Sequence, residues 1–173
     1  MESDAGQVSS RSERDRIAQA IATSYRSRVG RHLVPPVSNM EQLAESMMNA
    51  PAVILCHDGG AVREEPVFVY ANLAAAMLWR LTIEDLIGMP SRLSAPPEHR
   101  QERARMLARA AVEGVVVGYT GERVAADGTR FLIQDATLWN VELPDGTVGQ
   151  AVTFDQWRTI QDGPMSGSTA GIR

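Results

Sequence analysis

From Val115 onward, apolar and polar residues alternate with a period of two, and two Asp-Gly turns interrupt the alternation. The turns are Asp127-Gly128 and Asp145-Gly146. Asp-Gly between alternating runs is a strong hairpin signal, because both residues tolerate the positive φ of a tight turn. The pattern predicts three consecutive antiparallel strands. They cover residues 115–125, 130–143 and 148–154.

Two shorter apolar runs upstream predict two further strands, at residues 53–56 and 66–71. Asn72 follows the second run directly and is placed to cap the next helix. Helical patterns then continue as far as Gly114. Two strands, three helices and three strands fit one sheet with helices packed against it. The sequence therefore predicts an α+β fold: a five-stranded antiparallel sheet with helices on one face and an N-terminal helical extension.

The strand at residues 130–143 is apolar on both of its predicted faces. Strict alternation places four residues on one face, namely Phe131, Ile133, Thr137 and Trp139. It places three on the other face, namely Leu132, Ala136 and Leu138. Both faces of the sheet should therefore be covered. The helices between the strands would cover one face, and the N-terminal helices or a second protomer the other.

The helix that ends at Gly114 is predicted to carry a narrow apolar stripe. The stripe is Ala104, Leu107, Ala108 and Ala111. Arginines surround it, Arg103 among them, and acidic residues dilute their charge. We interpret these arginines as a solvated face.

The N-terminal segment is predicted to form two amphipathic helices. Residues 1–11 are polar and expected to be disordered, and a helix is predicted from Ser12. Its apolar residues recur at every fourth position: Ile17, Ile21, Tyr25 and Val29. A second helix should open with a capping box of Ser38 and Glu41. Its apolar face is Met40, Leu43 and Met47.

These two apolar faces lie outside the predicted sheet domain, and they predict a homodimer. The alternative is that the helices fold back over the outer face of the sheet. The predicted organisation is an N-terminal tail and helix at residues 1–37, a folded domain at 38–157, and a disordered tail at 158–173.

Composition and charge exclude several classes of protein. The formal net charge is −4, and the arginines near the N-terminus accompany no DNA-binding motif, so no direct nucleic-acid binding is predicted. No apolar run approaches the ~20 residues of a membrane helix. The N-terminus lacks the basic and apolar regions of a signal peptide, and a cytoplasmic location is predicted.

No set of residues points to catalysis. His57-Asp58 could begin a metal or phosphohydrolase site, but the other histidines, His32 and His99, stand in no ligand motif. The chain has no nucleophile elbow, Walker loop or dinucleotide fingerprint. We therefore predict neither a catalytic residue nor a metal site, and a protein that is not an enzyme.

Several blocks of sequence, in order, carry a resemblance to a known family. The blocks are PVFVYANLAAAMLW (66–79), LIGMPSRLSA (86–95), ERARMLARA (102–110), GYTGERVAADGTRFLIQDATLWN (118–140) and GQAVTFDQW (149–157). They resemble the MEKHLA family of PAS-like domains, in its stand-alone bacterial type, over about residues 40 to 157. Cys56 and Glu65 depart from the family, which usually has serine and aspartate there.

The resemblance implies a PAS-like fold without established enzymatic activity, acting as a sensor or protein-interaction module. In plant regulators the family's domain is associated with control of dimerisation. We predict that the module binds a small ligand, mediates dimerisation, or does both, and that any molecule in its pocket is small and mostly apolar. The candidate pocket residues are Asn140, Gln150, Trp139 and Arg92.

A flavin- or haem-binding photosensor or redox sensor is the alternative function, because PAS-type domains often hold such cofactors. Flavin-binding light sensors of this fold carry a reactive cysteine where this chain reads PSRLSA. Cys56 lies on a different element and is interpreted as a small buried hydrophobe. His99 is the candidate haem ligand. The sequence assigns no particular cofactor.

Overall fold

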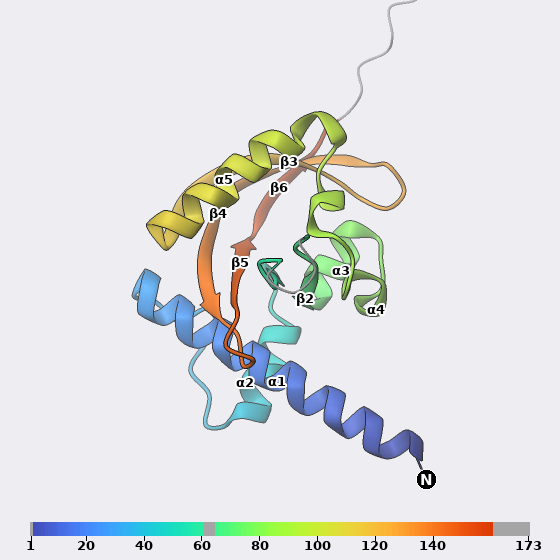
Figure 1. Cartoon of the computed structure of the whole chain (residues 1–173), viewed down its shortest axis with the longest axis vertical. Coiled ribbons are helices and arrows are strands. Elements are labelled where there is room, and N and C mark those ends of the chain that lie inside the picture. Colours follow the sequence, from blue (N-terminus) through green and yellow to red (C-terminus); the bar gives the residue numbers. More distant parts are fainter. Residues whose placement is uncertain (1, 61–64, 161–173) are drawn as a thin grey trace, which may run out of the picture.

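One antiparallel sheet organises the computed structural model, which describes residues 2–60 and 65–160 (Figure 1). The strand order is β2-β1-β5-β4-β3. The strands are β1 (Val53–His57), β2 (Phe68–Ala71), β3 (Val115–Val124), β4 (Arg130–Glu142), β5 (Val148–Phe154) and β6 (Gln156–Thr159). β6 continues the line of β5 along β4 after a break at Asp155. The predicted α+β class and five-stranded PAS-like sheet are confirmed, with the fifth strand in two segments.

The helices between β2 and β3 cover one face of the sheet (Figure 1). They are α3 (Leu73–Trp79), α4 (Ile83–Leu86) and α5 (Arg100–Glu113), with 3₁₀ turns η1 (Ser91–Ser94) and η2 (Pro97–His99). The core on this side includes Trp79, Phe131 and Phe154, whose rings meet edge to face. The predicted caps at Asn72 and Gly114 are confirmed.

Helices α1 (Glu2–Val29) and α2 (Met40–Met48) pack on the other face. Ile21, Tyr25 and Met47 are buried there against Trp139 and Val141 of β4. The apolar stripe of α1 is therefore satisfied within the chain and does not require a homodimer. The sequence analysis placed this helix outside the folded domain, but α1 contributes to the hydrophobic core on this face of the sheet.

Asn72 joins the N-terminal helices to the sheet. Its side chain is fully buried, and its Oδ1 accepts hydrogen bonds from the backbone N–H groups of Ile54 and Ala75. Its Nδ2 donates to carbonyls in the segment that follows α2, at Ala50 and Ala52, and to Met47. One amide side chain thus caps α3 and fixes the end of α2 to the start of β1.

Two predictions about the N-terminal segment are wrong. α1 begins at Glu2 rather than Ser12, because the polar residues 2–11 extend the helix that the buried stripe stabilises. The cap of α2 is Asn39, whose side chain accepts from the N–H of Gln42, and not a Ser38–Glu41 box. At the other end, β6 runs beyond the predicted domain end at residue 157, and residues 161–173 of the predicted tail lie outside the described residues.

A β-bulge in β4 overturns the predicted division of its faces. Asp135 has a φ of 50°, and the pairing of β3 with β4 shifts register there. The extra residue switches the alternation, so Phe131 and Ile133 share a face with Ala136 and Leu138. Trp139 points to the opposite face, toward α1. Strict alternation had placed Phe131 and Trp139 together.

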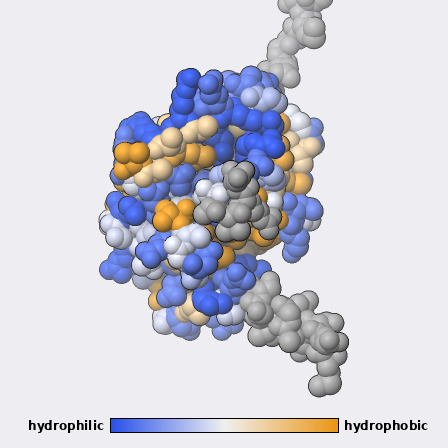
Figure 2. All heavy atoms as spheres, in the orientation of Figure 1, coloured by the Kyte–Doolittle hydropathy of each residue, from blue (hydrophilic) through white to orange (hydrophobic). Residues whose placement is uncertain are grey.

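The visible surface is mostly hydrophilic, with apolar side chains gathered over α5 (Figure 2). Val112, near the end of α5, is 88% exposed. Among the described residues, no helix has the length and apolar character needed to cross a bilayer.

Candidate functional site

The candidate site is a chamber between the sheet and helices α3 and α5. Its volume is about 30 Å³. The walls are largely apolar, from Leu55, Phe68, Leu107, Ile133, Leu138, Val152 and Phe154. Polar side chains interrupt these walls, from His57, Trp79, Ser94, Arg103, Arg123 and Gln150. A chamber of this size has room for about two or three water-sized groups.

Arg103 and Arg123 bring two guanidinium groups to this chamber. Arg103 projects from α5 and is 9% exposed, and Arg123 projects from β3 and is 7% exposed. Burial, and then the neighbouring charge of Arg123, lower the pKa of Arg103 to about 9. Neither arginine has an ion-pair partner within the part of the chain that the structure describes.

Arg103 corrects the sequence-based interpretation of α5. The buried residues of this helix are Arg103 and Ala110, with Met106 and Leu107 partly buried. The inward stripe is therefore 103, 106, 107 and 110, rotated by one position from the predicted 104, 107, 108 and 111. The i, i+4, i+7 spacing of Arg103, Leu107 and Ala110 was the missed signal, because an arginine on an apolar stripe was assigned to solvent.

Tyr119 and Gly121 fix the position of Arg123. The hydroxyl of Tyr119 lies 3.4 Å from both terminal nitrogens of Arg123, and the guanidinium sits 5.4 Å from the centre of the Tyr119 ring. Arg123 also donates to the carbonyl of Glu122 at 2.7 Å. A β-carbon at Gly121 would lie 2.1 Å from the Tyr119 hydroxyl oxygen. Glycine is therefore required for the tyrosine to lie flat on the strand and reach the arginine.

His57 and Trp79 each present a buried nitrogen without a hydrogen-bond partner among the described residues. The Nδ1 of His57 accepts from the N–H of Gly59 at 3.1 Å. This bond assigns the proton of the neutral imidazole to Nε2, which is the unpartnered atom. In Trp79 the unpartnered atom is the indole N–H. Both groups are therefore hydrogen-bond donors.

The His57 environment predicts acid sensitivity. Burial, then the charge of Arg103, lower the pKa of His57 to about 4, against the opposing effect of Asp58. The unfolded chain takes up this proton below pH ~6.5, whereas the folded chain resists it until pH is near 4. Stability from this group is thus complete above pH ~6.5 and decreases as the pH falls. We expect urea unfolding at pH 4.5 and 7 to show about 2–3 kcal/mol less acid destabilisation in His57→Asn than in wild type.

Asparagine at position 57 keeps an acceptor for Gly59 and removes the titrating group. His32→Asn is the matched control, since His32 is exposed. Equal acid destabilisation of wild type and His57→Asn would contradict this prediction.

Of the predicted pocket residues, Gln150 lines the chamber. Asn140 lies next to it and is hydrogen-bonded to the Gln150 side chain. The Nε2 of Gln150 donates to the Leu107 carbonyl at 2.9 Å and to Oδ1 of Asn140 at 3.1 Å. The Nδ2 of Asn140 donates to the Ala111 carbonyl at 3.0 Å. These amides therefore attach α5 to the sheet.

The structure places the other two predicted pocket residues away from the chamber. Trp139 lies on the opposite face, where its indole N–H donates to Oγ of Ser24 at 2.9 Å and its ring packs edge to face on Tyr25. Arg92 is half exposed and pairs with Glu65. Glu65 lies in the loop before β2.

The remaining candidates for redox or metal chemistry also lie outside the chamber. Cys56 is buried on the α1 side of the sheet, and burial raises the pKa of its thiol. His99 contacts Glu102 through Nδ1 and Glu122 through Nε2. No cluster of three or more metal-ligating side chains occurs in residues 2–60 and 65–160.

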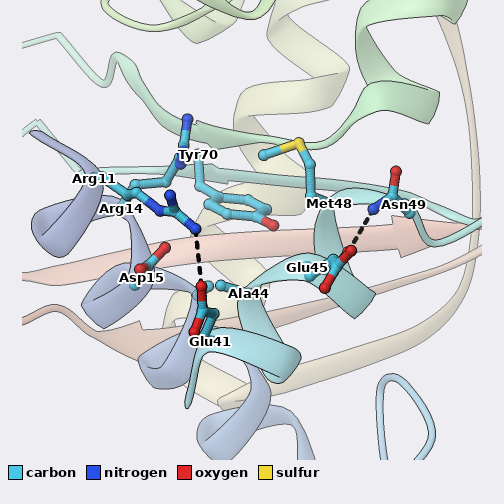
Figure 3. A pocket seen from close by; sticks show the side chains of 10 residues that line it. Arg11, Arg14, Asp15, Glu41, Ala44, Glu45, Met48, Asn49 and Tyr70 are labelled. Carbon is cyan, nitrogen blue, oxygen red and sulfur yellow. Dashed lines mark hydrogen bonds and ion pairs between the residues drawn. The ribbon is translucent and has the colours of Figure 1, made fainter. Parts of the chain in front are cut away.

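A second hollow, of about 430 Å³, lies between α1 and α2 above Tyr70 (Figure 3). Arg11, Arg14 and Asp15 face Glu41 and Glu45 across it, and Arg11 pairs with Glu41 at 3.2 Å. Both partners of this pair are more than 60% exposed, so solvent screens their charges. The buried hydroxyl of Tyr70 has no described partner there. The hollow combines charges of both signs on flexible side chains, whereas the chamber concentrates fixed donors.

Solved PAS domains share this fold. A PAS domain of a protein from Colwellia psychrerythraea aligns with a TM-score of 0.55 and 14% identity, over 70% of this chain and 96% of that one. A PAS domain of an HTR-like protein from Haloarcula marismortui aligns with a TM-score of 0.53 and 14% identity, over 69% and 90%. An RNA-binding light-oxygen-voltage receptor aligns with a TM-score of 0.55 and 20% identity, over 71% of this chain and 36% of the receptor.

Similarity at these identities establishes the fold alone. A comparison with curated proteins finds no match. The family comparison is more specific, since the MEKHLA domain matches residues 15–159, most of the chain. The match includes the buried part of α1, all of the sheet and both arginines of the chamber. The chain therefore belongs to the MEKHLA domain family and has a PAS-like fold.

Proposed function

We propose that the chain is a non-enzymatic sensory or protein-interaction module that responds to a small molecule in the chamber. The observation that carries this proposal is the sharing of one sheet by two cores. The chamber lies on one face and α1 on the other. A change in the chamber can therefore reach α1 through the thickness of a single sheet.

Asn140 provides a path between the two sides. Its side chain binds Gln150 and α5 on the chamber side. Its backbone carbonyl accepts from Nε of Arg28 on α1 at 3.0 Å, and its backbone N–H donates to Gly114. The Arg28 guanidinium also packs over Gly114, where a β-carbon would approach it to 2.7 Å. Movement of α5 relative to β4 would thus disturb the contacts of α1 with the sheet. We propose that the packing of α1 on the sheet is the bistable element.

Flavin and haem do not fit this chamber. Pockets for ligands of that kind have volumes of about 300–1,000 Å³, roughly ten to thirty times the volume found here. Cys56 faces away from the chamber, and both nitrogens of His99 contact carboxylates. No observation favours the photosensor or redox alternative.

The proposal includes a homodimer, but its interface would not be the apolar stripe of α1. With the stripe of α1 packed on its own sheet, a second protomer would have to use other surfaces. Met77 and Val112 are 79% and 88% exposed and are the apolar side chains most available for contact.

The proposal is tested by thermal-shift screening of small organic acids, amines, amides, phosphates and flavins. We expect at least one class to raise the melting temperature. Amide hydrogen exchange should then change in α1 as well as in α5, and light scattering should report any change in oligomeric state. In Arg28→Gln we expect the ligand to bind while the change in α1 is lost. If no class raises the melting temperature, or if bound ligands leave α1 unchanged, the sensory function is wrong.

A further inference from the structure

We propose that the chamber recognises a small carboxylate anion, held by Arg103 and Arg123. This inference rests on the proposed function and adds the chemical class of the ligand. Nothing in the family match or the fold assigns these residues a role.

The first argument is charge. Two guanidinium groups face one chamber, and neither has an acidic partner among the described residues. The acidic residues next to the two arginines in the sequence, Glu102 and Glu122, both contact His99, and Glu122 also pairs with Arg130. Two like charges that are buried together repel each other and lose their hydration. A bound anion would relieve both penalties.

The second argument is hydrogen bonding. The unpartnered nitrogens at the chamber, Nε2 of His57 and Nε1 of Trp79, are donors like the arginines. A buried polar group without a partner is costly, and folded proteins seldom retain several at one place. Donors from four elements, β1, α3, α5 and β3, surround the same space. Their shared requirement is a ligand that accepts hydrogen bonds.

The third argument is preorganisation. Gly121 lets Tyr119 lie against the strand, and Tyr119 holds Arg123 in place. On β5 of the same sheet, Gln150 is fixed by the carbonyl of Leu107, one turn of α5 after Arg103. The Arg123 guanidinium is thus held before a ligand arrives, which lowers the entropy cost of binding.

Size and shape select the carboxylate. The volume of about 30 Å³ suits an anion of about four or five non-hydrogen atoms, because covalently bonded atoms lie closer together than separate water molecules. A planar carboxylate matches the fork of a guanidinium, and the apolar walls accept a short aliphatic tail. Phosphate would place a larger and more highly charged group against the same apolar walls.

The experiment uses the full chain with sodium acetate and sodium propionate at constant ionic strength. Propionamide, methylammonium chloride, sodium chloride and sodium phosphate are the comparison solutes. We expect a saturable rise in Tm with the two carboxylates alone, of about 4 °C at a tenfold excess over Kd. An equal rise with propionamide, chloride or phosphate would overturn the assignment to carboxylates. If carboxylates fail and another class binds, the proposed function stands and this inference does not.

Arg103→Met removes one charge and keeps a long apolar side chain. We expect this variant to have a Tm at least as high as wild type without ligand, because an unpaired buried charge is gone, and no response to propionate. Arg105→Met is the matched control on the same helix, since Arg105 is exposed, and it should respond like wild type. A propionate response that survives in Arg103→Met would overturn the proposal. A lower Tm without ligand would show that Arg103 acts as a structural group.

The indole N–H signals of the three tryptophans can be measured in the wild-type chain, so this test does not depend on the folding of a variant. The indole N–H of Trp79 has no described partner, that of Trp139 binds Ser24, and Trp157 is 41% exposed. In ¹H–¹⁵N spectra, propionate should shift the Trp79 indole signal downfield and saturably, and leave the signals of Trp139 and Trp157 in place. A Trp79 signal that does not move at saturating propionate contradicts the site.

Discussion

Trp139→Ala is expected to lower the free energy of unfolding by about 3–5 kcal/mol, more than any histidine substitution in this chain. Trp139 is fully buried between β4 and α1, and it packs edge to face on Tyr25 with ring centres 4.9 Å apart. Truncation would open a cavity beneath α1 and leave the Ser24 hydroxyl without its donor. Urea unfolding at neutral pH measures the loss.

Trp157→Ala is the matched control, because Trp157 is 41% exposed on β6, and it should cost far less. Trp139→Phe separates the ring from the N–H group, since it keeps most of the packing and loses the bond to Ser24. The core assignment would be wrong if Trp139→Ala melted like wild type while His57→Ala unfolded the protein.

Asn72→Ala is expected to cost about 3 kcal/mol or more. The substitution removes the acceptor for two buried N–H groups, of Ile54 and Ala75, and the donor to three carbonyls near the end of α2. Each buried group left without a partner costs about 1–3 kcal/mol, although nearby groups share some of that loss. Chemical denaturation measures the total.

Asn72→Asp distinguishes the two roles of this side chain. Aspartate keeps the acceptor for Ile54 and Ala75 but turns a charged oxygen toward the carbonyls that Nδ2 now contacts. We expect Asn72→Asp to be destabilised at neutral pH and to regain part of that loss on acidification, as protonation restores one donor. A neutral-pH stability equal to wild type would mean that capping alone explains Asn72.

The sequence was sufficient where the signals are local. The Asp-Gly turns, the cap at Asn72 and the stop at Gly114 depend on residues that are neighbours in the chain, and each is confirmed. The division of faces in β4 could not be predicted, because the bulge at Asp135 depends on how β3 and β4 pair. One inserted residue reversed the assignment of every side chain on one side of it.

The chamber was hidden from sequence reasoning for a related reason. His57, Trp79, Arg103 and Arg123 lie on four separate elements, and nothing in their spacing brings them together. The sequence suggested amides as ligand-binding groups. In the structure the side-chain amides of Asn140 and Gln150 are hydrogen-bonded to each other and to backbone carbonyls of α5. Which polar groups remain without partners is a property of the packed structure.

The packing of α1 on the sheet has a consequence for how such a domain moves between proteins during evolution. A gene segment that starts at the predicted boundary of residue 38 would encode a sheet whose Trp139, Val141 and Ile54 face water. Recombination that joins this domain to new neighbours should therefore carry the helix with it. The family match starts at residue 15, just ahead of the buried positions Ala18 and Ile21. The segment that the family shares and the segment that packs as one folded unit thus begin at nearly the same residue.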